Sequence, residues 1–184
     1  MARTSRDGEV PSLRENALYG RIVYLTPNDN SVWIAPPEQV AEAGILTAAT
    51  SEELRAAVKA ETAAIIIDRD WMADIEPAWA RQMLADGKVV VGARLNISGL
   101  TTLLGVGAVT GASDGYPSSR LFYSLFSQPS CANHEGRVEW GAAADYLDRN
   151  QRGQFRLLIA RLVQHSQNQC VDFLATDSNL DSQP

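Results

Sequence analysis

Four polar residues with the chemistry to bind an ion follow two apolar segments near the middle of the chain. Asp68 and Asp70 come directly after the run AAIII, and Arg94 and Asn96 come directly after the run VVVGA. Carboxylate oxygens bind divalent cations or accept a phosphoryl group, and a guanidinium binds carboxylate or phosphate. These four residues therefore form a candidate ligand-binding site.

Two more residues belong to this candidate site. Trp71 follows Asp70 directly and is expected to lie over the same crevice, and Asp29 stands in the loop after an earlier apolar run. If the two runs are neighbours, Asp29 and Asp68 with water would form a minimal magnesium site, because hard cations require oxygen ligands. In the alternative interpretation, which we favour, the acidic residues after Asp68 are solvated and favour the start of the next helix.

The elements that must position these residues alternate between strands and helices. We predict strands at 21–26, 45–49, 63–67 and 89–93, and helices at 38–43, 50–60, 76–86 and 98–104. Ser31–Ala35 is expected to extend the first strand as a hairpin arm, and Ser98 is expected to cap the last helix. This alternation predicts a parallel sheet with helices on both faces, in which ligands bind at the carboxyl ends of the strands.

The pattern changes in the last third of the chain. We predict a strand at 121–127, and a segment 142–148 that leads into an amphipathic helix at 154–167. The fold class is therefore α/β: a flavodoxin-like three-layer sandwich with a mostly parallel sheet, plus an added C-terminal strand and amphipathic helix. The domain boundaries are a flexible arm at 1–18, one α/β domain at 19–174 and a disordered tail at 175–184.

The segment GILTAATSEELRAAVKAETAAIIIDRDWM, with GKVVVGARLN after it, resembles response-regulator receiver domains. The resemblance covers about residues 21–104 and implies that Asp68 occupies the phosphoacceptor position, with Mg²⁺ as cofactor if the pocket is functional. The pocket departs from the family pattern. Asn28 and Asp29 stand where the family has an acidic pair, Ala93 replaces its hydroxyl residue, and no lysine follows Lys88. The resemblance thus implies a receiver-like module with a degenerate phosphoacceptor pocket.

Composition excludes several classes of protein. The 184 residues are 45% hydrophobic and 21% charged, as in globular proteins, and the formal net charge of −6 argues against a nucleic-acid partner. No apolar run is long enough for membrane insertion, and no signal peptide is recognisable at the start. We therefore expect a cytoplasmic protein, or an extracytoplasmic one if an N-terminal anchor has been removed.

The two cysteines, Cys131 and Cys170, leave two states open. They form one disulfide if the protein is exported, or two reduced thiols if it is cytosolic. His134 lies three residues after Cys131, but such a spacing within a loop seldom gives nucleophile–base geometry, so we interpret this pair as structural. His165 falls near the end of the last predicted helix, where a cation is favoured. The Gly-rich segment 105–119 matches no phosphate-loop pattern.

No motif in the sequence specifies catalysis, and we predict no catalytic residue and no resident cofactor. The expected function is a non-catalytic, receiver-like regulatory or protein-interaction module of a bacterial signalling system, with a protein partner. A first alternative is a small-molecule or nucleotide-binding domain, or an enzyme, that uses the crevice at the strand ends. A second alternative is an extracytoplasmic domain with one disulfide.

Overall fold

Six strands form one sheet in the part of the chain that the computed structural model describes, which is residues 16–105, 122–127, 141–146 and 152–166. The strand order is β2-β1-β3-β4-β5-β6. The strands are β1 (Ile22–Leu25), β2 (Leu46–Ala48), β3 (Ala64–Asp68), β4 (Val89–Ala93), β5 (Phe122–Ser127) and β6 (Gly141–Tyr146). The first four are parallel, which confirms the predicted α/β sheet, and β5 and β6 continue it in antiparallel fashion.

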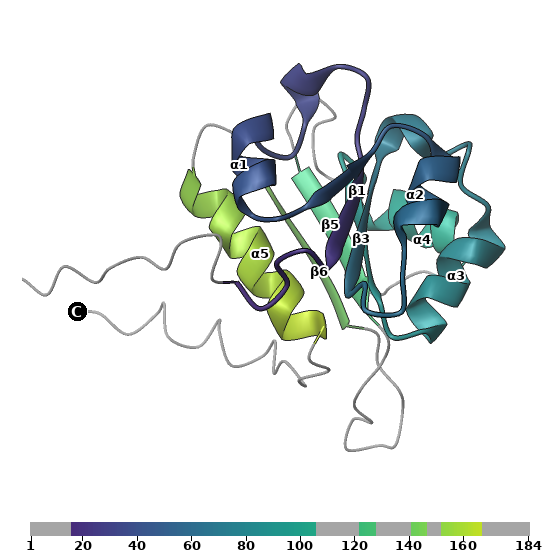
Figure 1. Cartoon of the computed structure of the whole chain (residues 1–184). Helices are drawn as coiled ribbons and strands as arrows, with labels where there is room; N and C mark the ends of the chain where they lie inside the picture. The colour runs from purple at the N-terminus through teal and green to yellow at the C-terminus, as the bar shows by residue number, and fades with distance from the viewer. Residues whose placement is uncertain (1–15, 106–121, 128–140, 147–151, 167–184) are drawn as a thin grey trace, which may run out of the picture.

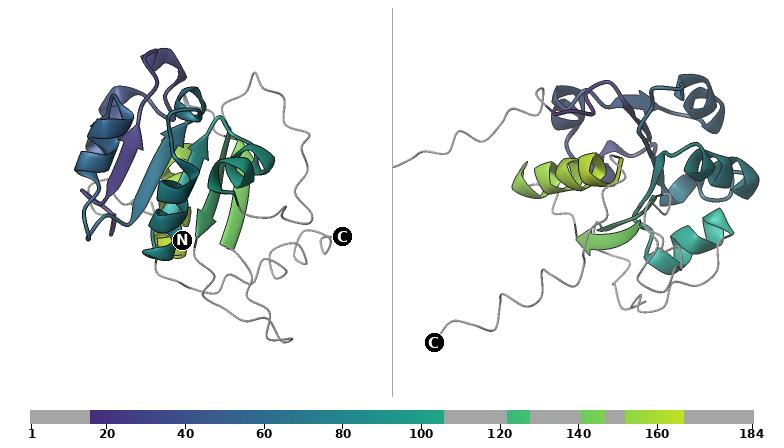
Figure 2. Two further views of the ribbon diagram at one scale, coloured as in Figure 1. Left: turned by 90° about the vertical axis from the view of Figure 1, so that its right-hand side faces the viewer. Right: turned by 90° about the horizontal axis from the view of Figure 1, so that it is seen from below.

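Helices cover both faces of this sheet (Figure 1). They are α1 (Pro37–Glu42), α2 (Ser51–Ala57), α3 (Pro77–Ala85), α4 (Ile97–Leu104) and α5 (Arg152–Ser166). Figure 2 shows α2, α3 and α4 on one side and α5 on the other, so the predicted three-layer arrangement is confirmed. None of the described helices is long and apolar enough to cross a lipid bilayer.

The two faces of the sheet carry separate hydrophobic cores because side chains alternate along each strand. On one face, Tyr24 and Ile66 pack with residues of α1 and with Phe155 and Leu158 of α5. On the other face, Val23 and Ile65 pack with residues of α2, α3 and α4. Since both faces are covered, the central strands are buried along their whole length, and this explains their continuous β-branched composition.

Local sequence signals set most helix ends. Thr50 accepts a hydrogen bond from the backbone N–H of Glu53 at 3.1 Å, and the Glu53 carboxylate accepts one from the N–H of Ala49 at 2.7 Å. The first bond satisfies an N–H group in the first turn of α2, and the second fixes the residue before its N-cap, one position earlier than in a standard capping box. Gly105 ends α4 in a left-handed conformation with φ 59°. Proline opens both α1 and α3, since its missing N–H costs nothing in the first helical turn.

Three expectations about local structure are wrong. Ser31–Ala35 does not form a hairpin arm, because Asp29 caps a short 3-10 helix over Asn30–Val32. The cap of α4 is Asn96 and not Ser98, because the Asn96 side chain accepts a hydrogen bond from the N–H of Gly99 at 2.7 Å. The helix α2 also ends three residues before the predicted end at Ala60, with Val58 as its extended C-cap.

Two corrections concern the ends of the domain. Residues 141–146 form the strand β6, where the alanine-rich sequence suggested the approach to a helix, so the sheet has two added strands and not one. Leu18, assigned to the flexible arm, is only 2% exposed and belongs to the core beside β1. Tertiary contacts, which the local sequence does not encode, decide both outcomes: pairing with β5 for β6, and burial in the core for Leu18.

Candidate functional site

The carboxyl ends of β1, β3 and β4 meet at one edge of the sheet. The chain leaves β1 toward β2 on one side and leaves β3 toward β4 on the other, so the strand order reverses between β1 and β3. In open α/β sheets this reversal creates the crevice in which ligands bind. The candidate residues predicted from the sequence lie in the segments that follow these strands.

Asp68 is the last residue of β3, and its side chain is fully buried. Its Oδ2 atom accepts a hydrogen bond from Nε of Arg94 at 3.0 Å, and its Oδ1 atom accepts a second one from Nη2 of Arg94. Oδ1 also accepts a hydrogen bond from the backbone N–H of Asp70 at 3.0 Å, which caps the 3-10 helix Arg69–Trp71. Both oxygens of the carboxylate are therefore engaged by groups of the protein itself.

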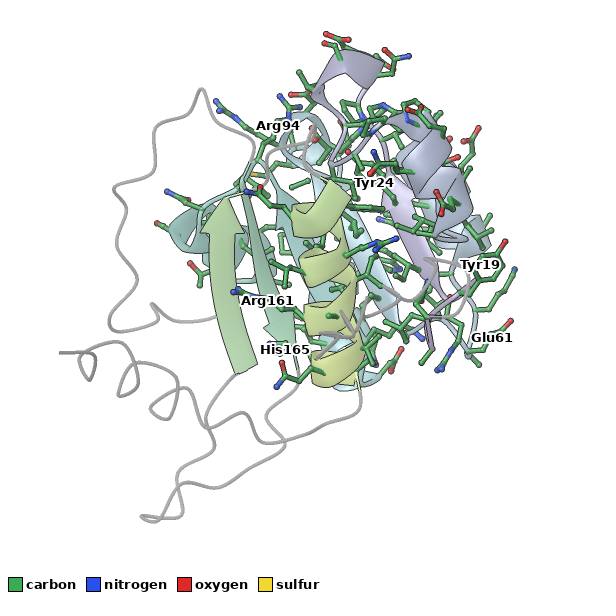
Figure 3. The ribbon with its side chains drawn as sticks, turned by 90° about the vertical axis from the view of Figure 1, so that its left-hand side faces the viewer. Tyr19, Tyr24, Glu61, Arg94, Arg161 and His165 are labelled. Atoms are coloured by element: carbon green, nitrogen blue, oxygen red, sulfur yellow. The ribbon has the colours of Figure 1, made fainter. Side chains whose placement is uncertain are left out.

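Arg94 brings two carboxylates together. It follows β4 directly, and its Nη2 atom lies 2.7 Å from Oδ2 of Asp70 as well as beside Asp68. The Arg94 side chain is 20% exposed, whereas the Asp70 side chain is 55% exposed, so the cluster opens to solvent on the Asp70 side. Figure 3 shows Arg94 and Tyr24 toward the same end of the sheet, away from His165 at the far end of α5. The structure thus joins three of the six candidate residues into one ion-pair cluster.

Burial and the ion pairs shift the pKa values of this cluster in definite directions. Burial raises the pKa of Asp68, against the opposing effect of its hydrogen bonds from Arg94. The hydrogen bond to Asp68 raises the pKa of Arg94, so this guanidinium stays charged at every physiological pH. Burial, with the nearby charge of Asp68, raises the pKa of Tyr24, so its phenol stays neutral. Arg94 is accordingly a permanent internal counter-ion for Asp68.

Two tryptophans bond to the segment that follows β1, at the edge of the crevice beside this cluster. The indole Nε1 of Trp71 donates a hydrogen bond to the carbonyl oxygen of Thr26 at 2.8 Å, which links the end of β3 to the end of β1. The Nε1 of Trp33 donates to the carbonyl oxygen of Pro27 at 3.1 Å, and its ring meets Tyr24 edge-on at 5.9 Å. Both indoles are partly buried and pack against the hydrophobic cores of the sheet. Sequence reasoning assigned Trp71 to this crevice but missed Trp33.

The contribution of the hydrogen bond between Trp71 and Thr26 to stability can be tested by substitution. Trp71→Phe removes the donor but keeps an aromatic ring, and we expect it to lower the free energy of unfolding by about 1 kcal/mol, as measured by urea denaturation. Trp79→Phe is the matched control, because Trp79 contributes its ring face to Arg55 at 5.5 Å and needs no indole donor for that contact. Equal stabilities of the two variants would show that the bond contributes nothing.

The remaining predicted site residues act locally. The Asp29 carboxylate accepts hydrogen bonds from the backbone N–H of Ser31 at 2.8 Å and from its hydroxyl at 2.7 Å. Asn96 is the cap of α4. In the described part of the chain, no group of three or more His, Cys, Asp or Glu residues could hold a metal ion. The magnesium hypothesis based on Asp29 and Asp68 thus gains no support from the observed contacts of either residue.

Of the histidine and cysteine candidates, only His165 lies within the described residues. Cys131, Cys170 and His134 lie outside the described residues. His165 falls in the last turn of α5, as predicted, but it is buried. Burial, with the nearby charge of Arg161, lowers the pKa of His165, so the neutral imidazole is favoured and not the cation expected at a helix end.

The sequence placed Asp68 and Arg94 at the ends of two strands predicted to be adjacent, but it did not identify them as partners. No local pattern identifies which strand end supplies the partner of a buried carboxylate, and only the register of β3 with β4, in which Asp68 lies opposite Ala93, brings Arg94 next to it. No family model matches the chain, and no curated protein matches it.

Proposed function

We propose that this protein is a non-catalytic, receiver-like regulatory or protein-interaction module of a bacterial signalling system. One observation carries the proposal: both oxygens of the buried Asp68 carboxylate accept hydrogen bonds from Arg94. A carboxylate that accepts a phosphoryl group needs a free oxygen as nucleophile. In this arrangement the guanidinium supplies, from within the chain, the positive charge that a magnesium ion would supply in a working pocket.

The sequence around the cluster supports the same conclusion. The receiver-like resemblance includes Asp68, but Ala93 stands where that family has a hydroxyl residue, and no lysine follows Lys88. These are the groups that would position a phosphoryl group. Their replacement, together with the pairing to Arg94, favours a scaffold that has kept the fold without the phosphorylation chemistry.

Exposed apolar side chains support action through the protein surface. Among the described residues, the large apolar side chains that are exposed are Tyr19, Leu46 and Leu157. Apolar side chains at the surface favour contact with another macromolecule, and the net charge of −6 favours a protein over a nucleic acid.

Incubation with acetyl phosphate and Mg²⁺ tests the central claim. We expect the intact mass of the wild-type protein to stay unchanged, because Arg94 blocks both oxygens of Asp68. The variant Asp68→Asn is the control for modification at other sites. A gain of one phosphoryl group in the wild type that is absent from Asp68→Asn would overturn the proposal.

A binding experiment tests the interaction half of the proposal. The tagged full chain should retain protein partners from its own cells, and this set should not change when Mg²⁺ and beryllium fluoride, a phosphoryl mimic, are added. Failure to retain any protein would contradict an interaction module. A set that changes with the mimic would show a working phosphorylation switch.

A further inference from the structure

The turn between β4 and α4 has an unusual backbone. Arg94 has φ 58°, and it is the sole non-glycine residue with positive φ in the part of the chain that the structure describes. An L-residue in this left-handed region is disfavoured by on the order of tenfold relative to its ordinary conformations. Something outside the local backbone must therefore hold Arg94 in place.

Side-chain contacts hold this turn from two sides. The Arg94 side chain bonds to Asp68 and to Asp70, which belong to the end of β3 and to the 3-10 helix after it. Leu95 folds back on Gly92, where an added Cβ atom would lie only 2.8 Å from Cβ of Leu95. The turn is thus fixed by an ion-pair cluster on one side and by close packing on the other.

We propose that Arg94 is a latch: its ion pairs with Asp68 and Asp70 hold the β4–α4 turn in the left-handed conformation, and protonation of Asp68 releases the turn and loosens the first turn of α4. The link to α4 is short. Asn96, two residues after Arg94, caps the helix through the N–H of Gly99, so a change at Arg94 moves the cap. This inference goes beyond the proposed function and does not depend on it.

The groups around Asp68 make it the acid-sensitive member of the latch. Among the described residues, the charged or titratable groups that act on it are Arg94 from the β4–α4 turn, Asp70 from the 3-10 helix and Tyr24 from β1. Arg94 stays charged and Tyr24 stays neutral during mild acidification. Because burial raises the pKa of Asp68, its protonation begins at a less acidic pH than that of an exposed aspartate.

The sign of the pH effect distinguishes release of the latch from acid denaturation. The folded-state pKa of Asp68 is above its unfolded value, so acidification through that folded-state pKa does not weaken the folded state through this group. The ion pair opens while the sheet stays intact. The expected change is therefore confined to the turn and to the start of α4.

Hydrogen exchange measured by NMR tests the latch on the full chain. On acidification from neutral pH toward the ordinary aspartate pKa of about 4, protection of the amides at 99–101, corrected for intrinsic rates, should fall several-fold. Amides of α3 serve as the internal control and should keep their protection. Asp68→Asn should show the low protection already at neutral pH. Wild-type protection at 99–101 that is independent of pH would overturn the proposal.

Two substitutions at Arg94 separate the backbone penalty of its positive φ from the loss of its ion pairs. Arg94→Ala removes the guanidinium and keeps the backbone penalty, whereas Arg94→Gly removes both, because glycine adopts positive φ without that penalty. We expect protection at 99–101 to be on the order of tenfold higher in Arg94→Gly than in Arg94→Ala. Equal protection in the two variants would show that the left-handed backbone at position 94 carries no penalty for the ion pairs to offset, and this would overturn the proposal.

Discussion

Arg94→Ala is expected to lower the free energy of unfolding by about 3 kcal/mol at neutral pH, as measured by urea denaturation. The loss of stability comes from the buried Asp68 carboxylate, which no longer has its counter-ion. Asp68 is fully buried, and among the described residues its remaining hydrogen-bond donor without Arg94 is the N–H of Asp70, with no other positive charge acting on it. Removing one member of a buried ion pair costs more than the pair itself contributes, since the partner's desolvation is no longer offset.

The cost of Arg94→Ala depends on pH with a definite sign. Burial and the negative charge of Asp70 both raise the pKa of Asp68, and loss of Arg94 removes the main opposing interaction. A carboxylate whose folded-state pKa lies above its unfolded value destabilises the fold increasingly as the pH rises through the folded-state pKa. The difference in stability between wild type and variant should therefore shrink as the pH falls toward about 4.

Two further variants make this result specific. The double variant Arg94→Ala/Asp68→Asn should recover much of the loss at neutral pH, because the buried charge is gone. Arg55→Ala is the matched control for loss of an ion pair, since Arg55 and Glu76 are 3.7 Å apart with 42% and 62% of their side chains exposed. We expect it to cost less than about 0.5 kcal/mol through this ion pair. A pH-independent cost of Arg94→Ala would contradict the argument.

Lys88→Met should lower the free energy of unfolding by about 2 kcal/mol. Lys88 is only 5% exposed, and its ammonium donates hydrogen bonds to the carbonyl oxygens of Lys59 at 3.0 Å, Ala60 at 3.3 Å and Thr62 at 2.9 Å. These carbonyls belong to the loop between α2 and β3. Methionine keeps the apolar stem but removes this donor from all three acceptors. The Lys59 carbonyl still accepts a hydrogen bond from the N–H of Thr62 at 3.2 Å, whereas the carbonyl of the buried Thr62 loses a donor inside the protein, which is costly.

The chain supplies its own control for this experiment. Lys59 is the one other lysine in the sequence, and it is exposed, with a single hydrogen bond from Nζ to the carbonyl oxygen of Ala56 at 2.7 Å. Lys59→Met should change the free energy of unfolding by less than about 0.5 kcal/mol. If both substitutions have the same small effect in thermal or urea denaturation, the three carbonyls are satisfied without Lys88.

Most of the α/β architecture could be predicted from the sequence because its elements carry strong local patterns. The runs at 63–67 and 89–93 are continuous and β-branched, which is typical of strands buried on both faces. Thr50 and Glu53 mark the start of α2, and prolines mark the starts of α1 and α3. The strand β6 escaped prediction because its sequence, GAAADY, has no strand-like pattern, and pairing with β5 decides its conformation.

The candidate site was predictable by position but not by pairing. The sequence placed Asp68, Asp70, Trp71 and Arg94 after adjacent strands, and the structure confirms that placement. It also grouped Asp29 and Asn96 with them, although both are used as helix caps. A capping residue and a ligand-binding residue have the same side-chain chemistry, so only the local backbone distinguishes the two roles.

By itself, the sequence determined the parallel core, the order of its elements and the edge of the sheet where polar side chains gather, because these follow from short-range periodicity and turn chemistry. Only the tertiary structure decided that Arg94 neutralises Asp68 and that Trp71 bonds to the carbonyl oxygen of Thr26. Those contacts join residues 26 and 45 positions apart in the chain, and they depend on the register of three strands. A shift of one residue in that register would turn each side chain to the opposite face of the sheet.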